Sequence, residues 1–288
     1  MSQIRFARGL PDEFISALSN GCLEQLLRSV VSRRLDVQIR EHSLHVYAQG
    51  RRVLNLKRGQ QRGTYVSEIH CDYQRGVPWR TPPTVDSKGY CRFHVDAAFL
   101  DMYTASIDRI LQNAADMPMR KEATVEEKLI QENHYPGSSL VFFDRQVQLH
   151  GTPKRMDLIG LSSRPQPKII LTELKYGVNK DIPLLMDQIS SYYNLIAPDG
   201  YLREDVSRSY RDVIVQKQKL GLMSHEISMP DERPIVECLV VLYDYNERSE
   251  LLDRLKQAAK QHPLPVWHVL LSKGQFVIPP AADWSMLS

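Results

Sequence analysis

Three charged residues on two consecutive predicted strands have the types and spacing to do chemistry. In ILTELKYG (170–177), Glu173 and Lys175 stand two positions apart, so on a strand both side chains lie on one face. The preceding predicted strand, KRMDLIGL (154–161), presents Asp157 in the same way. If the two strands pair antiparallel across the loop SSRPQPK, Asp157 lies beside Glu173.

Two neighbouring carboxylates repel each other, and each raises the pKa of the other. A divalent cation removes this penalty, and carboxylate oxygens are the ligands that Mg²⁺ and Mn²⁺ prefer. Lys175 can then polarise or deprotonate a water held by the metal. The group therefore indicates metal-assisted hydrolysis of a phosphodiester. The structural alternative is an exposed salt bridge on an edge strand.

A helix predicted over IPLLMDQISSYYNLI (182–196) carries Gln188 and Tyr192 one turn apart on the same face. Together, GTPKRMDLIG, TELKYG and QISSY resemble, in this order, the motifs of RecB-type members of the PD-(D/E)xK nuclease superfamily. The matching residues are Gly151 and Asp157, then Glu173 and Lys175, then Gln188 and Tyr192. The resemblance covers about residues 119–200, and Met156 stands where the superfamily name has Pro.

The resemblance implies a Mg²⁺- or Mn²⁺-dependent deoxyribonuclease, a hydrolase of DNA repair or defence. It implies that Asp157 and Glu173 bind the metal, with the Leu174 carbonyl as a further ligand. It also implies that Lys175 is the catalytic lysine. Gln188 and Tyr192 would support the site.

The superfamily also places a glutamate on the helix before the first strand of the site. The segment KEATVEEKLIQEN offers Glu122, Glu126 and Glu127. Glu122 fits the superfamily pattern best, and Glu126 lies one turn further on the same face. Glu127 has a structural explanation, because Thr124 and Glu127 have the spacing of a capping box.

Hydrophobic periodicity in the second half predicts the order α-β-β-β-α-α-β-α-β. We expect an α/β fold, with a three-layer restriction-endonuclease-like core over residues 117–288 in which helices flank a mixed central sheet. Residues 1–116 are expected to form a smaller α+β accessory domain. Its predicted elements are a helix over 11–34, a three-stranded meander over 35–57, an irregular loop over 72–90 and a helix over 95–115.

The positive charge is concentrated in the N-terminal part. Residues 1–120 carry 17 Lys and Arg against 12 Asp and Glu, whereas residues 121–288 carry 20 against 22. The segment RRVLNLKRGQQR (51–62) contains Arg51, Arg52, Lys57 and Arg58 without an acid. These residues, together with Arg155, are candidates for contacts with the DNA backbone. A solvated hairpin face is the alternative, and a homodimer interface is another use of this domain.

The composition of the chain indicates its cellular compartment and one kind of partner protein. The chain has no run of about 18 apolar residues and no apolar segment at its start, so we expect no membrane span and a cytoplasmic protein. The four cysteines are widely spaced, which argues against a disulfide scaffold and for a reducing compartment. No phosphate-binding G-x-x-x-x-G-K-[ST] motif is present, so an ATP-driven step would need a partner ATPase or helicase.

Two further hypotheses remain. His70 and Cys71, with Cys91 and His94, have the residue types of a zinc site, although adjacent residues chelate one metal poorly. The alternative function is that of a nucleic-acid-binding or assembly subunit that keeps the fold but does not cut.

Overall fold

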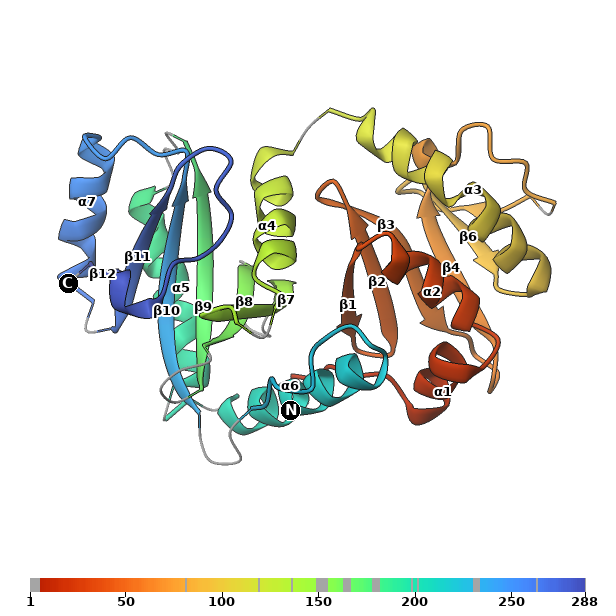
Figure 1. Cartoon of the computed structure of the whole chain (residues 1–288), viewed down its shortest axis with the longest axis horizontal. Helices are drawn as coiled ribbons and strands as arrows, with labels where there is room; N and C mark the ends of the chain where they lie inside the picture. The colour runs from red at the N-terminus through yellow and green to blue at the C-terminus, as the bar shows by residue number, and fades with distance from the viewer. Residues whose placement is uncertain are drawn as a thin grey trace. The chain divides into compact units, whose positions relative to one another are not determined.

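Two six-stranded sheets and seven α-helices form a mixed α/β structure in the part of the chain that the structure describes (Figure 1). This computed structural model describes residues 6–80, 82–118, 120–135, 137–148, 155–162, 167–177, 182–197, 199–200, 202–229, 234–262 and 264–287. None of the helices in these ranges is long and apolar enough to cross a membrane.

The chain divides into two compact units. The N-terminal unit comprises Arg8–Glu127 and Val215–Met223, and the C-terminal unit comprises Met1–Ala7, Lys128–Ile214 and Ser224–Ser288. The boundary expected at residues 116–117 lies within the N-terminal unit, directly after its longest helix.

The N-terminal unit is a sheet in the order β1-β2-β3-β4-β6-β5, and every neighbouring pair of strands is antiparallel. Its elements are α1 (Asp12–Asn20), α2 (Glu24–Ser32), β1 (Asp36–Arg40), β2 (Ser43–Ala48), β3 (Arg51–Arg58), β4 (Tyr65–His70), the 3₁₀ turn η1 (Cys71–Gln74), β5 (Thr84–Val85), β6 (Tyr90–His94), α3 (Ala97–Ala115) and the first part of α4 (Lys121–Glu132). The predicted three-stranded meander is confirmed by β1, β2 and β3.

The helix predicted over residues 11–34 is two helices, because the chain leaves helical geometry at Gly21. This glycine has extended backbone angles, and a Cβ atom there would lie 2.9 Å from the Cα of Ala17. The turn between β2 and β3 also depends on the backbone conformation of particular residues. Gln49 and Gly50 both have left-handed φ angles, of 54° and 70°, which suit a tight hairpin turn.

The C-terminal unit is a mixed sheet in the order β12-β11-β10-β9-β8-β7. Its elements are β7 (Leu140–Val147), β8 (Met156–Ser162), β9 (Lys168–Tyr176), α5 (Ile182–Ile196), α6 (Arg203–Lys219), β10 (Ile235–Tyr243), α7 (Glu250–Ala259), β11 (Val266–Leu271), the 3₁₀ turn η2 (Ala281–Asp283) and β12 (Ser285–Met286). The predicted order of helices and strands is confirmed from α4 to β11, and α6 ends in the N-terminal unit.

The strands that carry the candidate site are deeply buried. Strand β9 lies between β8, which is antiparallel to it, and β10, which is parallel to it. Helix α5 packs against β9 and β10 and beside α7. The apolar side chains of β9, such as Ile170, Leu171 and Leu174, are almost completely buried. The charged residues near the end of β9 therefore adjoin an apolar, buried part of the sheet.

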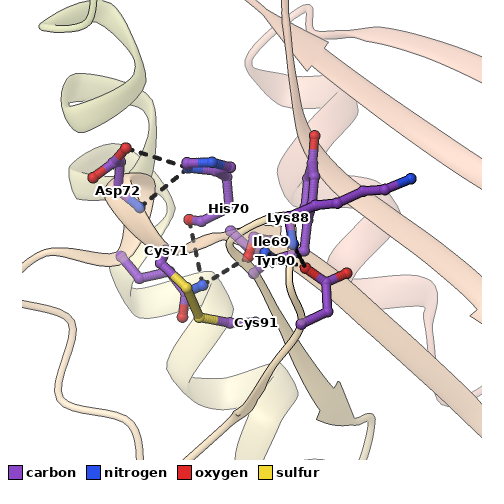
Figure 2. The surroundings of a disulfide bond; sticks show 9 residues. Ile69, His70, Cys71, Asp72, Lys88, Tyr90 and Cys91 are labelled. Carbon is purple, nitrogen blue, oxygen red and sulfur yellow. Dashed lines mark hydrogen bonds and ion pairs between the residues drawn. A yellow bond between two sulfur atoms is a disulfide. The ribbon is translucent and has the colours of Figure 1, made fainter.

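A disulfide joins Cys71 at the start of η1 to Cys91 in β6, with 5.7 Å between the Cα atoms (Figure 2). The expectation that the widely spaced cysteines are reduced is thus wrong for this pair, because antiparallel pairing of β4 with β6 brings distant residues together. The zinc hypothesis is also wrong, since disulfide sulfurs are not thiolate ligands. The neighbouring His70 ring accepts a hydrogen bond from the backbone N–H of Asp72 at 3.3 Å.

Candidate active site

The pairing of β8 with β9 brings two carboxylates together. The strands are antiparallel, and their register ends at Leu158 opposite Thr172, the neighbours of Asp157 and Glu173 along the two strands. The Asp157 charge acts directly on Glu173. This confirms the pairing expected across the loop. Gly151, which belongs to the same sequence motif, lies outside the described residues.

Hydrogen bonds fix the two carboxylates and the lysine. The ammonium group of Lys175 lies 2.9 Å from Glu173 Oε1. The backbone N–H of Leu174 donates to Asp157 Oδ2 at 2.9 Å, and the side-chain amide of Gln146 donates to Asp157 Oδ1 at 3.1 Å. Strands β7, β8 and β9 thus each contribute to one small polar cluster.

Glu173 is buried in an unfavourable electrostatic setting. Its side chain is 2% exposed, and its Oε2 atom receives no hydrogen bond from the described residues. Burial, followed by the charge of Asp157, raises the pKa of Glu173 to about 8, although Lys175 acts in the opposite direction. The lysine therefore does not compensate fully for burying Glu173 beside a second carboxylate.

The cluster contains two carboxylates, whose oxygens are the kind of ligand that a hard divalent cation prefers. An unsatisfied buried carboxylate oxygen beside a second carboxylate is a site where a cation is favourable. The N–H of Leu174 donates to Asp157, so the backbone there lies next to the same carboxylate. Among the described residues, no group of three or more His, Cys, Asp and Glu side chains could hold a metal. The fit therefore rests on two carboxylates supported by the main chain.

The two residues predicted on α5 bind the backbone of the strand region. Tyr192 is fully buried and donates its hydroxyl proton to the Val147 carbonyl at the end of β7, at 2.8 Å. Gln188 donates to the Arg155 carbonyl, just before β8, also at 2.8 Å. Both contacts attach α5 to the chain segments that carry Gln146 and Asp157.

Gln146 is a site residue that the sequence analysis did not identify. It occupies a left-handed backbone conformation with φ of 49°, which is uncommon for a residue other than glycine. Strand β7 also has an irregular register between Phe142 and Asp144. No sequence pattern marks this residue, because the alternation of LVFFDRQVQL is that of an ordinary strand.

The three candidate glutamates all lie on α4, in the part that belongs to the N-terminal unit. Glu126 and Glu127 are buried, and Glu122 is half-buried. The carboxylate of Glu127 accepts the backbone N–H groups of Gln49 and Gly50, at 3.0 and 2.7 Å. The capping-box explanation for Glu127 is wrong, because α4 begins at Lys121 and Thr124 lies inside the helix. Glu127 instead fixes the turn between β2 and β3.

Two of the candidate DNA-binding arginines make contacts within the N-terminal unit. Arg51 is buried and donates to the Pro118 carbonyl. The guanidinium of Arg52 lies over the ring of Tyr90, 5.0 Å from its centroid. Arg155, in the C-terminal unit, is exposed.

The other two candidate cations form ion pairs but keep exposed surface. Lys57 lies 2.9 Å from Glu68, which also pairs with Arg92 at 3.0 Å. Arg58 lies 2.8 Å from Glu13. The side chains of Lys57 and Arg58 are 40% and 39% exposed, so both retain part of their surface for solvent or a ligand.

Comparison of the chain with protein-family models, with curated proteins and with solved structures found no match. The functional assignment therefore rests on the motifs in the sequence and on the geometry of the Asp157–Glu173–Lys175 cluster.

Proposed function

We propose that this protein is a Mg²⁺- or Mn²⁺-dependent nuclease that hydrolyses phosphodiester bonds in DNA. The observation that carries the proposal is the interaction of the buried Glu173 with the half-buried Asp157, with Lys175 bound to the Glu173 carboxylate. A structural salt bridge needs only one carboxylate for one lysine. The second carboxylate adds repulsion, which a divalent cation would relieve.

The residues of the cluster have distinct tasks in this mechanism. A bound cation would polarise the scissile phosphate and favour ionisation of the attacking water. Asp157 and Glu173 would hold that cation, and the Leu174 carbonyl is a further candidate ligand. The ammonium group of Lys175 would hold the attacking water and donate to the oxygens of the phosphate, where negative charge develops.

Other residues would keep these groups in place. Gln146 and the Leu174 N–H orient the Asp157 carboxylate by donating to its two oxygens. Tyr192 and Gln188 attach α5 to the chain around them. Such supporting hydrogen bonds matter because small displacements of ligands weaken metal binding and catalysis.

The mixed sheet of the C-terminal unit supports a restriction-endonuclease-like core as the fold of this nuclease. We further propose that the protein acts on DNA, in repair or defence, and that any ATP-driven step is supplied by a separate ATPase or helicase. The exposed parts of Lys57, Arg58 and Arg155 are the proposed contacts with the DNA backbone.

Cleavage of labelled single- and double-stranded DNA and of RNA tests this function. Wild type and Asp157→Asn are each incubated with Mg²⁺, Mn²⁺ or EDTA. We expect DNA products with either metal, none in EDTA and none from the variant. Metal-independent products, or equal products from both proteins, would contradict the proposal.

The second candidate function is a DNA-binding subunit that does not cut. The observation in its favour is the 2.9 Å ion pair between Lys175 and Glu173, in which the lysine offsets the charge of one of the two carboxylates. It predicts DNA binding that is equal in Mg²⁺ and EDTA, with no cleavage of any of the substrates above.

A further inference from the structure

The N-terminal unit contains a pocket of about 240 Å³ between the loop after η1, β6 and the start of α3. Trp79 and Arg80 come from the loop, Arg92, Phe93 and His94 from β6, and Phe99 from α3. All of these residues belong to one compact unit. The disulfide joins Cys71, at the start of η1, to Cys91 of β6 (Figure 2).

One wall of the pocket is a stack of aromatic rings. The Trp79 ring is 4.4 Å from Phe93 and 5.4 Å from Phe99, and it is nearly parallel to Phe99, at 7°. Phe99 in turn stacks on Tyr103, which is fully buried. Trp79 remains half-buried, and its buried indole N–H has no hydrogen-bond partner among the described residues. The wall therefore offers a flat apolar surface.

The rim of the pocket is positively charged. Arg80 is exposed and forms no ion pair or side-chain hydrogen bond within the described ranges. Arg92 gives one nitrogen to Glu68, yet its side chain is 63% exposed. The nearby carboxylate of Asp96 is directed to the helix, where it accepts the N–H of Phe99 as the N-cap of α3. A guanidinium has five N–H donors, so both arginines can still bind an anion.

We propose that this pocket binds one nucleotide unit, with its base on the aromatic wall and its phosphate at Arg80 and Arg92. Base stacking on aromatic side chains is favourable for every base, and arginine binds phosphate through paired hydrogen bonds. The pocket is smaller than the roughly 300–1,000 Å³ of sites for drug-sized ligands, which suits a single base. The nucleotide is either free or part of a nucleic-acid strand. The inference needs no cleavage at Asp157 and Glu173.

Binding to the whole 288-residue chain in EDTA tests the inference, because the proposed nuclease is inactive without metal. Equilibrium dialysis measures the affinity for dAMP, for adenosine, and for a short 5′-phosphorylated oligonucleotide. We expect dAMP to bind about tenfold more tightly than adenosine, since only dAMP brings a charged hydrogen-bond acceptor to the arginines. Binding should also quench tryptophan fluorescence, and Trp79→Phe should abolish the quenching.

The matched variants are Arg80→Gln, in the loop after η1, and Lys88→Gln, in the turn between β5 and β6, and both cations are exposed. Arg80→Gln should lower the affinity for dAMP about tenfold, to that of adenosine, and Lys88→Gln should leave it unchanged. An oligonucleotide that binds more tightly than dAMP would identify a strand as the source, and equal affinity would identify a free nucleotide. Absence of binding by both dAMP and the oligonucleotide, or an unchanged affinity in Arg80→Gln, would overturn the inference.

Discussion

At the scale of single residues, the charges on β9 have an explanation that the sequence already indicated. Strand periodicity places Glu173 and Lys175 on one face, and antiparallel pairing adds Asp157. The burial of Glu173 could not be predicted in the same way, because it depends on packing across the whole sheet. Gln146 was not predictable either, since its reach to Asp157 depends on a left-handed backbone at the end of β7.

Replacing Gln146 tests whether it orients the Asp157 carboxylate. Gln146→Asn is the suitable change, because asparagine tolerates left-handed backbone and its amide is one methylene shorter. We expect metal affinity to fall about 10- to 100-fold, as is typical when a supporting hydrogen bond to a metal ligand is lost. Isothermal titration with Mn²⁺ measures this. The exposed Gln275→Asn is the control, and equal affinities in both variants would refute the role.

At the scale of secondary-structure elements, α5 positions the strands through its polar side chains. The Q-x-x-x-Y spacing correctly placed Gln188 and Tyr192 on one helical face. The partners of these side chains were not readable from the sequence, because both are backbone carbonyls outside α5. These contacts indicate that α5 holds β7 and β8 in place.

Tyr192→Phe tests this support. The variant leaves the Val147 carbonyl without the hydroxyl, so we expect the free energy of unfolding to fall by about 1 kcal/mol. At saturating metal, the cleavage rate should stay close to that of wild type. Urea denaturation and cleavage kinetics measure the two effects, with Tyr193→Phe on the same helix as the control. A large loss of rate without a loss of stability would instead indicate a direct role in catalysis.

His45 on strand β2 is expected to make the N-terminal unit less stable at acidic pH. Burial, with further lowering by the charges of the flanking strands, brings the pKa of His45 to about 2. Below its ordinary pKa of about 6.5, the unfolded chain therefore takes up a proton that the folded protein does not. Stability should decrease as the pH falls from 7 to 5, by at most about 1.4 kcal/mol per pH unit from this group.

The variant His45→Gln should reduce that pH dependence. Chemical denaturation at pH 7, 6 and 5 measures it, and His225→Gln, at an exposed position, is the control. The same slope in His45→Gln and in wild type would show that His45 titrates normally in the folded protein.

At the scale of the whole molecule, elements were easier to predict than their long-range partners. The order of elements in the second half follows from periodicity and turn residues. By contrast, the segment Val215–Met223 joins the N-terminal unit through contacts such as Lys217 with Gln38, at 3.0 Å. Likewise, β4 pairs with β6 across a turn-rich loop. Such pairings join residues far apart in sequence, and no local pattern encodes them.

The Cys71–Cys91 disulfide is a long-range contact with a measurable effect. Cross-linking residues 20 positions apart restricts the unfolded chain, so the double variant Cys71→Ser/Cys91→Ser should lose about 3 kcal/mol of stability. Denaturation under non-reducing conditions measures this, with Cys22→Ser as the control. If a reducing agent lowers the stability of the double variant as much as that of wild type, the loss of stability does not come from breaking the disulfide.

The measurement that tests the account most directly is the rate of DNA cleavage by Lys175→Met and Lys168→Met. Both lysines lie on β9 and pair with a glutamate, Lys175 with Glu173 and Lys168 with Glu237. We predict that Lys175→Met reduces the Mg²⁺-dependent rate at least about a hundredfold, while Lys168→Met stays close to wild type. Melting temperatures confirm that both variants fold. Equal rates in the two folded variants would contradict the assignment of Asp157, Glu173 and Lys175 as a nuclease site.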